Sequence, residues 1–531
     1  MRSSSPFRTA GFALAAALVV AACSSGESAL TSGEGGDDTQ PPDTPVTEPP
    51  SSDPADSGSD DTDGTVDAEG TVATEPAGSE PPAPSTTEAP LADHPPCPVD
   101  ALDAADGPVE LQFWHGMANE LEDALQERTD AYNAGQDRVR VELQNQTSYE
   151  DAIEKYIQLG QGNRPELIQL PEYVVQSMAE SDTFIPVEAC IEASAFDVSP
   201  FLPRSLVTYQ FEGIQWAMPF NISDPVLYYN KNMFEAAGLD PENPPLTLEE
   251  LRETAQTLVD SGAAGFGLVL DTGRDSGGGW YIEQWFGRLE EPYADNGNGR
   301  LAPATEVLFD SQAGVDLMTF LQDMIDDGLA VNVGDNPGGQ DAFLKMIDQS
   351  APGAMTIGSS AALGSVTVAL GAGLGEAMGL TDESIGVGYM PGPSDEPSAQ
   401  LGGASLWIPA DKGDAQAAAA WDFIRFLTTA ESQSIWSSST GYVPNREDAI
   451  EIEPLKTTFA EDPRYTVAYE QLLTRADDPL ANAPVLGPQR EVRLETAKAT
   501  AAIFKGADAQ TELSKAVEAS NRLIDSYNRR N

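Results

Sequence analysis

The strongest constraint on the fold is a repeated switch between strand-like and helix-like spacing of apolar residues. Residues 109–114 alternate apolar and polar side chains, as a half-buried strand does, and helical spacing follows directly. The first series of strands covers 109–114, 139–143 and 166–170, with helices over 120–132, 149–159 and 172–179. Because strands that alternate with helices form βαβ units, we predict an α/β fold with mostly parallel sheets.

A second series of alternating elements follows the first. Thr247 and Glu250 have the spacing of a capping box and open one of its helices. We predict strands at 215–221, 226–230, 265–270, 353–357, 386–391 and 404–408, with helices at 231–237, 247–259, 311–327, 338–348, 414–429, 431–437, 491–505 and 509–526. Two such series predict two lobes around a cleft, since open α/β sheets bind ligands at strand ends and domain interfaces.

The N-terminus reads as an export signal over residues 1–22. Its apolar run, 11–22, is well short of the ~20 residues that span a bilayer as a helix. The run ends in Val20-Ala21-Ala22-Cys23, which resembles a bacterial lipobox and predicts lipidation of Cys23. The alternative is an ordinary signal peptide cleaved beside an incidental cysteine.

Residues 23–96 form a low-complexity segment rich in Pro, Ser, Thr, Asp and Glu. Residues 24–96 contain no Lys, Arg or aromatic residue, so they have too little apolar surface to offset the entropy of ordering the chain. We therefore predict an extended, disordered acidic stalk, and no other segment is long and apolar enough to be a membrane span.

Charge and cysteine content narrow the classes of function. A formal net charge of −58 argues against nucleic-acid binding, which needs a basic surface. Beyond Cys23 the chain has two cysteines, Cys97 and Cys190, and an even pair in an exported chain predicts a disulfide. Two free thiols are the alternative.

Catalytic and metal-binding motifs are scarce. The only histidines are His94 and His115, which weakens any His-rich metal site or Ser-His-Asp triad. Gly277-Gly278-Gly279 lacks the Lys-Ser/Thr ending of a P-loop. Carboxylates are too abundant for a glycosidase-like pair to be excluded, although nothing in the sequence selects one. These observations favour binding over catalysis, with no cofactor and no metal.

Several motifs together resemble one known family. They are Phe113-Trp114-His115-Gly116-Met117, the run Pro219-Phe220-Asn221-Ile222-Ser223-Asp224-Pro225-Val226-Leu227-Tyr228-Tyr229-Asn230-Lys231, Ala237-Gly238-Leu239-Asp240-Pro241, Gly402-Gly403-Ala404-Ser405-Leu406-Trp407 and Thr440-Gly441-Tyr442-Val443-Pro444. In this order they resemble the family 1 extracellular solute-binding proteins of bacterial ABC importers, in the glycerol-3-phosphate and glycerophosphodiester subgroup. The resemblance implies a two-lobe periplasmic-binding-protein (Venus flytrap) fold with a hinge. It places 97–224 plus 404–442 in one lobe and 225–403 plus 443–531 in the other.

The resemblance also implies a set of ligand-binding residues. The family's glycerol-contacting positions fall on Tyr149 and Glu172, and its phosphate-binding Arg falls on Arg493, or on Arg490 after a register shift. A planar guanidinium suits bidentate phosphate binding, and a carboxylate accepts from adjacent hydroxyls. Ile222 departs from the family pattern and removes one possible donor. The full expected set is Tyr149, Glu172, Ser223, Trp280, Ser359, Gly403, Tyr442 and Arg493.

The function implied is capture of glycerol-3-phosphate or a glycerophosphodiester and its delivery to the transmembrane subunits of an ABC permease. The protein would be a monomer, lipid-anchored at the outer face of the cell membrane. A neutral mono- or oligosaccharide on the same scaffold is the main alternative, for which Trp280, Tyr281 and Trp285 offer aromatic platforms. An exported hydrolase is the remote alternative.

Overall fold

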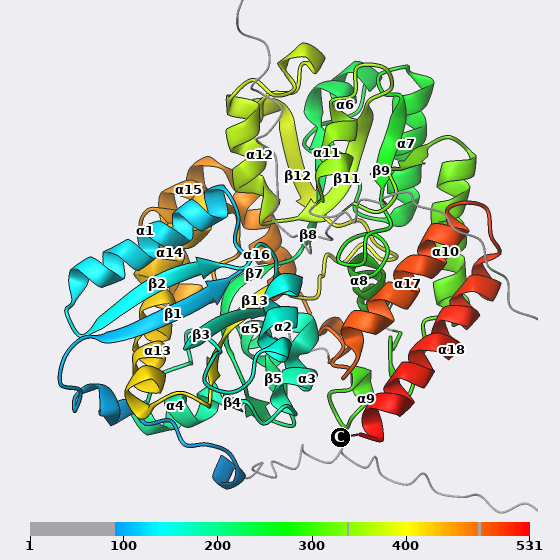
Figure 1. Ribbon diagram of the computed structural model, residues 1–531. Helices are drawn as coiled ribbons and strands as arrows, with labels where there is room; N and C mark the ends of the chain where they lie inside the picture. The colour runs from blue at the N-terminus through cyan, green and yellow to red at the C-terminus, as the bar shows by residue number, and fades with distance from the viewer. Residues whose placement is uncertain (1–90, 290, 337–338, 476–478, 531) are drawn as a thin grey trace, which may run out of the picture. The chain divides into compact units, whose positions relative to one another are not determined.

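Two β-sheets, each covered by helices, organise the computed structural model, which describes residues 91–289, 291–336, 339–475 and 479–530 (Figure 1). The predicted signal peptide, Cys23 and the stalk up to residue 90 lie outside the described residues. The α/β class predicted from the sequence is confirmed. No helix in the described ranges is long and apolar enough to cross a membrane.

The first lobe is built on a sheet of six strands in the order β2-β1-β3-β13-β4, with β7 also paired to β13. The strands are β1 (Val109–His115), β2 (Val139–Asn145), β3 (Leu167–Pro171), β4 (Phe184–Ile185), β7 (Met218–Ser223) and β13 (Gly402–Pro409). Its helices include α1 (Glu120–Gly135), α2 (Tyr149–Gln158), α3 (Val175–Ala179), α4 (Val187–Ser194), α5 (Pro203–Thr208), α13 (Asp414–Leu427), α14 (Ala430–Thr440) and α15 (Leu455–Glu461). Since α15 packs on α14, part of the chain after residue 442 also lies against this lobe.

The second lobe is built on a sheet of five strands in the order β10-β9-β11-β8-β12. The strands are β8 (Pro225–Asn230), β9 (Phe266–Leu270), β10 (Ala330–Asn332), β11 (Gly353–Ser359) and β12 (Ile385–Tyr389). Its helices include α6 (Lys231–Ala237), α7 (Leu248–Asp260), α8 (Trp280–Arg288), α10 (Gln312–Asp326), α11 (Gln340–Met346), α12 (Ala362–Gly371), α17 (Gln489–Ile503) and α18 (Ala509–Asn528). The predicted capping box is confirmed, because Glu250 N donates to Thr247 Oγ1 (3.1 Å) and Thr247 N to Glu250 Oε2 (3.0 Å).

The prediction of mostly parallel sheets is wrong, since both sheets are mixed. The pairs β1–β2, β1–β3, β9–β10 and β9–β11 are parallel, whereas β8 and β13 run antiparallel to their neighbours. The chain passes from β7 into β8 with only Asp224 between them, and returns to the first sheet through β13. The strands that follow a crossing between the lobes, β8 and β13, run opposite to the strands of the βαβ units. The local spacing of apolar residues does not reveal this direction.

The described fold begins before the predicted end of the stalk at residue 96. Leu91–Asp93 form a 3₁₀ turn, and Leu91 packs against the core of the first lobe. The ring centroids of His94 and Trp216 lie 4.9 Å apart in an edge-to-face arrangement. Disorder was therefore the wrong prediction for residues 91–96, where Leu91 packs on the core and His94 packs on Trp216.

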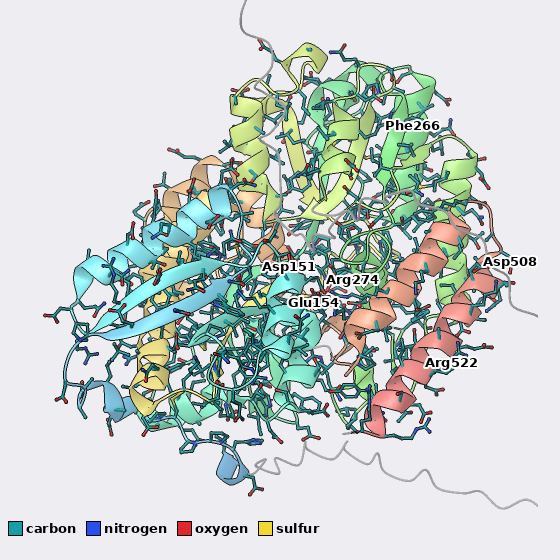
Figure 2. The ribbon with its side chains drawn as sticks, viewed as in Figure 1. Asp151, Glu154, Phe266, Arg274, Asp508 and Arg522 are labelled. Atoms are coloured by element: carbon teal, nitrogen blue, oxygen red, sulfur yellow. A yellow bond between two sulfur atoms is a disulfide. The ribbon has the colours of Figure 1, made fainter. Side chains whose placement is uncertain are left out.

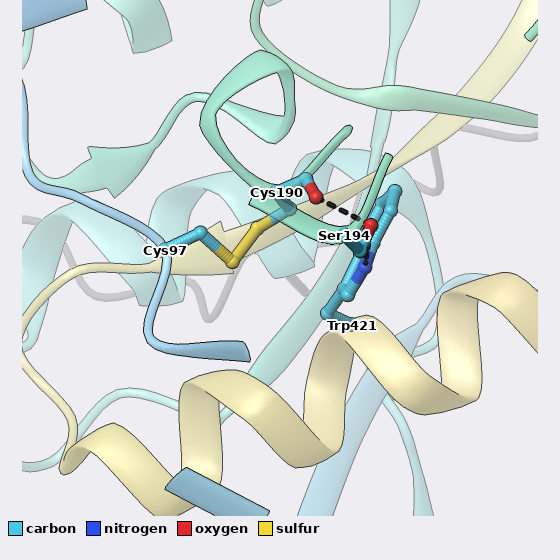
Figure 3. The surroundings of a disulfide bond; sticks show 4 residues. All are labelled: Cys97, Cys190, Ser194 and Trp421. Carbon is cyan, nitrogen blue, oxygen red and sulfur yellow. Dashed lines mark hydrogen bonds between the residues drawn. A yellow bond between two sulfur atoms is a disulfide. The ribbon is translucent and has the colours of Figure 1, made fainter. Parts of the chain in front are cut away.

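The predicted disulfide between Cys97 and Cys190 is present, with the two Cα atoms 4.9 Å apart (Figure 3). Cys190 lies on α4, where Ser194 Oγ donates to its carbonyl oxygen (2.6 Å) and accepts from Trp421 Nε1 on α13 (3.1 Å). The bond therefore joins the start of the fold to the helices on one side of the first lobe.

Candidate functional site

A chain of side-chain hydrogen bonds fixes Tyr149 at the ends of the first lobe's strands. Asn221 Nδ2 donates to Tyr149 Oη (2.9 Å), and Gln169 Nε2 donates to Asn221 Oδ1 (2.7 Å). Gln169 Oε1 in turn accepts from Gly116 N (3.0 Å). Ser148 caps α2 by accepting from Asp151 N, which starts the helix beside this chain. The phenol of Tyr149 is thus held by polar groups from β3 and β7.

Ser223, Trp280 and Gly403 meet where β7 and β13 pair. Ser223 lies opposite Gly402, and Gly403 lies opposite Ile222. A Cβ added at Gly402 would collide with the Trp280 ring, so this aromatic side chain of the second lobe packs directly on the first-lobe backbone. Gly403 has φ +94°, and a Cβ there would collide with the carbonyl oxygen of residue 221. The backbone at Gly403 therefore requires glycine, both for its positive φ and for its close approach to the carbonyl oxygen of residue 221.

Two buried donors at this junction have no hydrogen-bond partner among the described residues. They are Ser223 Oγ and Trp280 Nε1, whose residues are 0% and 4% exposed. Residues directly opposite on paired strands project to the same face of a sheet. Because Gly402 faces Trp280, its partner Ser223 lies on the face of the sheet that carries this indole. Buried polar groups are nearly always bonded, so Ser223 Oγ and Trp280 Nε1 are two donors available to a ligand at this junction.

Ser359 and Tyr442 lie beside the segment that connects β7 to β8. Ser359 belongs to β11, which pairs with β8, and Tyr442 precedes Val443, which bonds to β7. Ser359, at the end of β11, is paired with Pro225 of β8, and its Oγ accepts from Ala361 N (3.3 Å). Tyr442 stacks on Trp436 with ring centroids 5.6 Å apart and is almost fully buried. Val443 N donates to Ile222 O (2.9 Å), which brings Tyr442 beside β7. Both residues therefore gather around the crossing at residues 221–225.

Arg493, on α17, is buried among carboxylates. Its Nε and Nη2 donate to Glu283 Oε1 (2.8 Å) and Oε2 (2.7 Å), and Nη2 also donates to Glu172 Oε1 (2.9 Å). Its Nη1 lies 3.8 Å from Asp275 Oδ1, and the guanidinium carbon is 5.0 Å from the Tyr173 ring centroid. Arg493 is 1% exposed. Arg493 thus lies between the lobes, paired with Glu172 of the first lobe, and its phosphate-binding role stays a prediction.

Glu150 is the centre of a second set of contacts between the lobes. Its Oε1 accepts from Tyr173 Oη (2.6 Å) within the first lobe and from Arg274 Nη2 (2.8 Å) of the second. Arg490 pairs with Glu150 and, through Nη2, with Glu154 Oε1 (2.9 Å). Figure 2 labels Arg274 and Glu154. Each of the four pairs Glu150–Arg274, Glu150–Arg490, Glu154–Arg490 and Glu172–Arg493 joins an acid of the first lobe to a base of the second. We call Glu150, Glu154, Glu172, Arg274, Arg490 and Arg493 the interlobe cluster.

Burial dominates the electrostatics of this region. Desolvation raises the pKa of Glu172 to about 7, although the Arg493 charge and hydrogen bond lower it. Desolvation also raises the pKa of Asp224 well above its ordinary value, against the hydrogen bond from Gln471. The phenol pKa of Tyr209 is raised by burial and then by the Glu172 and Tyr149 charges. Tyr209 Oη is a further buried hydroxyl with no partner in the described ranges.

Sequence reasoning missed several residues of this region. Glu283 follows Trp280 by three positions on α8, so the two share one helix face, and that spacing was the available signal. Arg274, Tyr173 and Glu150 carried none, because single acids, bases and tyrosines occur throughout the chain. No cluster of three or more potential metal ligands occurs in the described ranges.

Residues 127–466 match the family model described as bacterial extracellular solute-binding protein, which covers well over half of the chain. The chain therefore belongs to this family of solute-binding proteins, and it is a binding protein rather than an enzyme. Among curated relatives, sn-glycerol-3-phosphate-binding periplasmic protein UgpB of Pectobacterium atrosepticum is 28% identical over 432 residues, covering 79% of this chain and 92% of that protein. UgpB of Escherichia coli K12 is 28% identical over 426 residues, covering 78% and 92%.

Solved structures confirm the two-lobe fold. UgpB of Mycobacterium tuberculosis in complex with glycerophosphocholine aligns with TM-score 0.63 and 21% identity, over 80% of this chain and 99% of that one. The cyclic alpha-maltosyl-1,6-maltose binding protein of Arthrobacter globiformis aligns with TM-score 0.62 and 23% identity, over 79% and 100%. The GacH receptor of Streptomyces glaucescens, solved with acarbose, has TM-score 0.64 and 17% identity, over 80% and 100%. At these sequence identities the structural similarity establishes the fold but does not identify the ligand.

Proposed function

We propose that the protein captures glycerol-3-phosphate or a glycerophosphodiester between its lobes and delivers it to an ABC permease. It acts as a monomer at the outer face of the cell membrane, tethered through lipidated Cys23 and the acidic stalk. Relatives that bind sn-glycerol-3-phosphate by name align over 92% of their length, which supports this ligand class. Binding shifts an open–closed equilibrium, and no bond is made or broken.

The observation that carries the proposal is the pair of unpartnered buried donors beside a cation. Leaving each donor unbonded costs about 1–3 kcal/mol, which an oxygen-rich ligand would offset. Ser223 Oγ and Trp280 Nε1 supply donors, and the backbone of Arg493 runs close to the residue before Trp280, since a Cβ added at Gly279 would come within 3.2 Å of Arg493 Cβ. In the proposed complex these groups, with Ser359 and Gly403, surround the phosphate.

The glycerol part lies on the first-lobe side of this proposed site. Tyr149 Oη is already oriented by Asn221, and Glu172 accepts from the ligand hydroxyls. Tyr442 closes the site as a flat, buried aromatic wall against Trp436. The family resemblance favours Arg493, and its side chain is 2% exposed against 28% for Arg490, so we assign the anion-facing role to the more buried Arg493.

A second candidate is a neutral saccharide on the same scaffold. It is favoured by the carboxylates around Arg493, since Glu283 already occupies two of its donor nitrogens. A ligand without charge would leave these pairs intact and use hydroxyls for Ser223 and Trp280. The maltosyl-maltose-binding and acarbose-binding relatives in fold fit this alternative.

Calorimetric titration with glycerophosphocholine, glycerol-3-phosphate and maltose tests the proposal. We expect binding of at least one glycerophosphate and none of maltose. Heat from maltose alone would overturn the ligand class in favour of the second candidate.

Matched variants locate the ligand. Ser223→Ala is expected to weaken binding without lowering the melting temperature, because its Oγ bonds no group of the protein. Ser205→Ala is the control, since Ser205 is equally buried and its Oγ donates to Leu202 O (2.7 Å). That variant should lower the melting temperature and leave affinity unchanged. Equal affinities for Ser223→Ala and the parent would exclude Ser223 from the site.

A further inference from the structure

Glu283 is a fully buried carboxylate with no place in the proposed ligand contacts. It is 0% exposed and lies on α8, one turn after Trp280. Both its oxygens accept from Arg493, and Oε1 also accepts from Gln489 Nε2 (3.2 Å). A buried ion pair often stabilises the fold no more than apolar side chains of similar volume would. Stability alone therefore does not explain why Glu283 is paired with Arg493 beside the proposed site.

The Glu283 carboxylate changes what Arg493 can do. A guanidinium binds phosphate best through two parallel donors, and Glu283 already takes such a pair from Nε and Nη2. Glu172 shares Nη2, and Asp275 lies 3.8 Å from Nη1. Arg493 therefore faces three carboxylates, of which only Asp275 is also paired with a second base, Arg274, among the described residues. These surroundings of Arg493 favour a ligand with little net negative charge.

We propose that Glu283 is a specificity-determining residue that selects a phosphodiester, with a single negative charge, over a phosphomonoester dianion. This rests on the proposed function and narrows its ligand class. A phosphomonoester has a second pKa near 6 and is mostly a dianion at pH 7.5, whereas a diester remains a monoanion. If the ligand's additional negative charge lies about 6 Å from the Glu283 carboxylate, at an effective dielectric constant of about 20, the repulsion between these two charges weakens binding about 100-fold.

The test is the ratio of dissociation constants for glycerol-3-phosphate and glycerophosphoglycerol, a phosphodiester with no cationic group, at pH 7.5. Glu283→Gln keeps the shape of the side chain and removes its charge. We expect the variant to lower this ratio on the order of 10- to 100-fold relative to the parent protein. A purely structural role would lower the melting temperature and leave the ratio unchanged, which would overturn the inference.

Two further variants control the experiment. Glu512→Gln removes one charge at an exposed pair with Lys515 and should leave the ratio unchanged. Asp275→Asn removes a partly exposed carboxylate near the same guanidinium, and should shift the ratio in the same direction by a smaller factor even if Glu283→Gln does not fold. An unchanged ratio in Asp275→Asn would then count against the inference. If the parent protein binds neither glycerophosphate, the proposed function itself fails.

Discussion

Glu150→Gln is expected to shift the unliganded protein toward an open arrangement of the lobes. The variant keeps the hydrogen bond from Tyr173 within the first lobe but removes the charge that holds Arg274 and Arg490 of the second. The side chain of Glu150 is 8% exposed and those of the two arginines 11% and 28%, so the contacts are only partly screened by solvent.

The size of the effect follows from these contacts. Hydrogen bonds to charged groups contribute about 1.5–3 kcal/mol each, against about 1 kcal/mol for neutral ones. Weakening two partly screened contacts should therefore move the equilibrium by about 2 kcal/mol, or roughly 30-fold. Ligand affinity should fall by up to the same factor, because the ligand binds only the closed fraction.

Small-angle X-ray scattering of the unliganded protein measures this shift as an increase in radius of gyration. Glu154→Gln is the matched control, since Glu154 lies one turn away and pairs with Arg490 at an exposed position, so its effect should be much smaller. Raising NaCl from 0.1 to 1 M should open the parent protein in the same direction. Identical scattering and affinity for Glu150→Gln and the parent would show that the Glu150 contacts do not hold the lobes together.

Three other expectations concern stability. Replacing Cys97 with Ser should lower the unfolding free energy by about 2–5 kcal/mol in denaturant titration and leave affinity unchanged, because the disulfide lies within the first lobe; an affinity loss at constant stability would contradict this. Burial raises the pKa of Glu172 from 4.5 to about 7, so its protonation favours the folded state below pH 4.5, and this contribution is lost as pH rises through about 7. Urea unfolding should therefore show the parent losing stability relative to Glu172→Gln between pH 4.5 and 8, and a constant difference would count against it. Gly403→Ala, at φ +94° and with its Cβ against a carbonyl oxygen, should lower the melting temperature sharply in scanning calorimetry, whereas an unchanged value would show that the turn relaxes.

The sequence predicted most elements because their signals are local. Alternation located β1 and β2, the spacing of Thr247 and Glu250 located the start of α7, and cysteine arithmetic found the disulfide. Strand direction was predicted wrongly because it depends on where the chain crosses between lobes. That crossing is a long-range property of the chain.

The candidate site was predictable only in part, for a similar reason. Family motifs placed Ser223, Trp280 and Gly403, and the structure brings them together. Glu283 and Glu150 were missed because the chain has 86 acidic residues, and only tertiary contacts show which of them face an arginine. The surroundings of Arg493 are therefore the main result that the structure adds.

The most direct test of the account is a crystal structure of the protein grown with glycerophosphocholine. We predict ligand oxygens within hydrogen-bond distance of Ser223 Oγ and Trp280 Nε1, with the phosphate on the Arg493 side and the glycerol toward Tyr149. A ligand bound elsewhere, or a site in which both donors remain unbonded, would contradict the proposed glycerophosphate site.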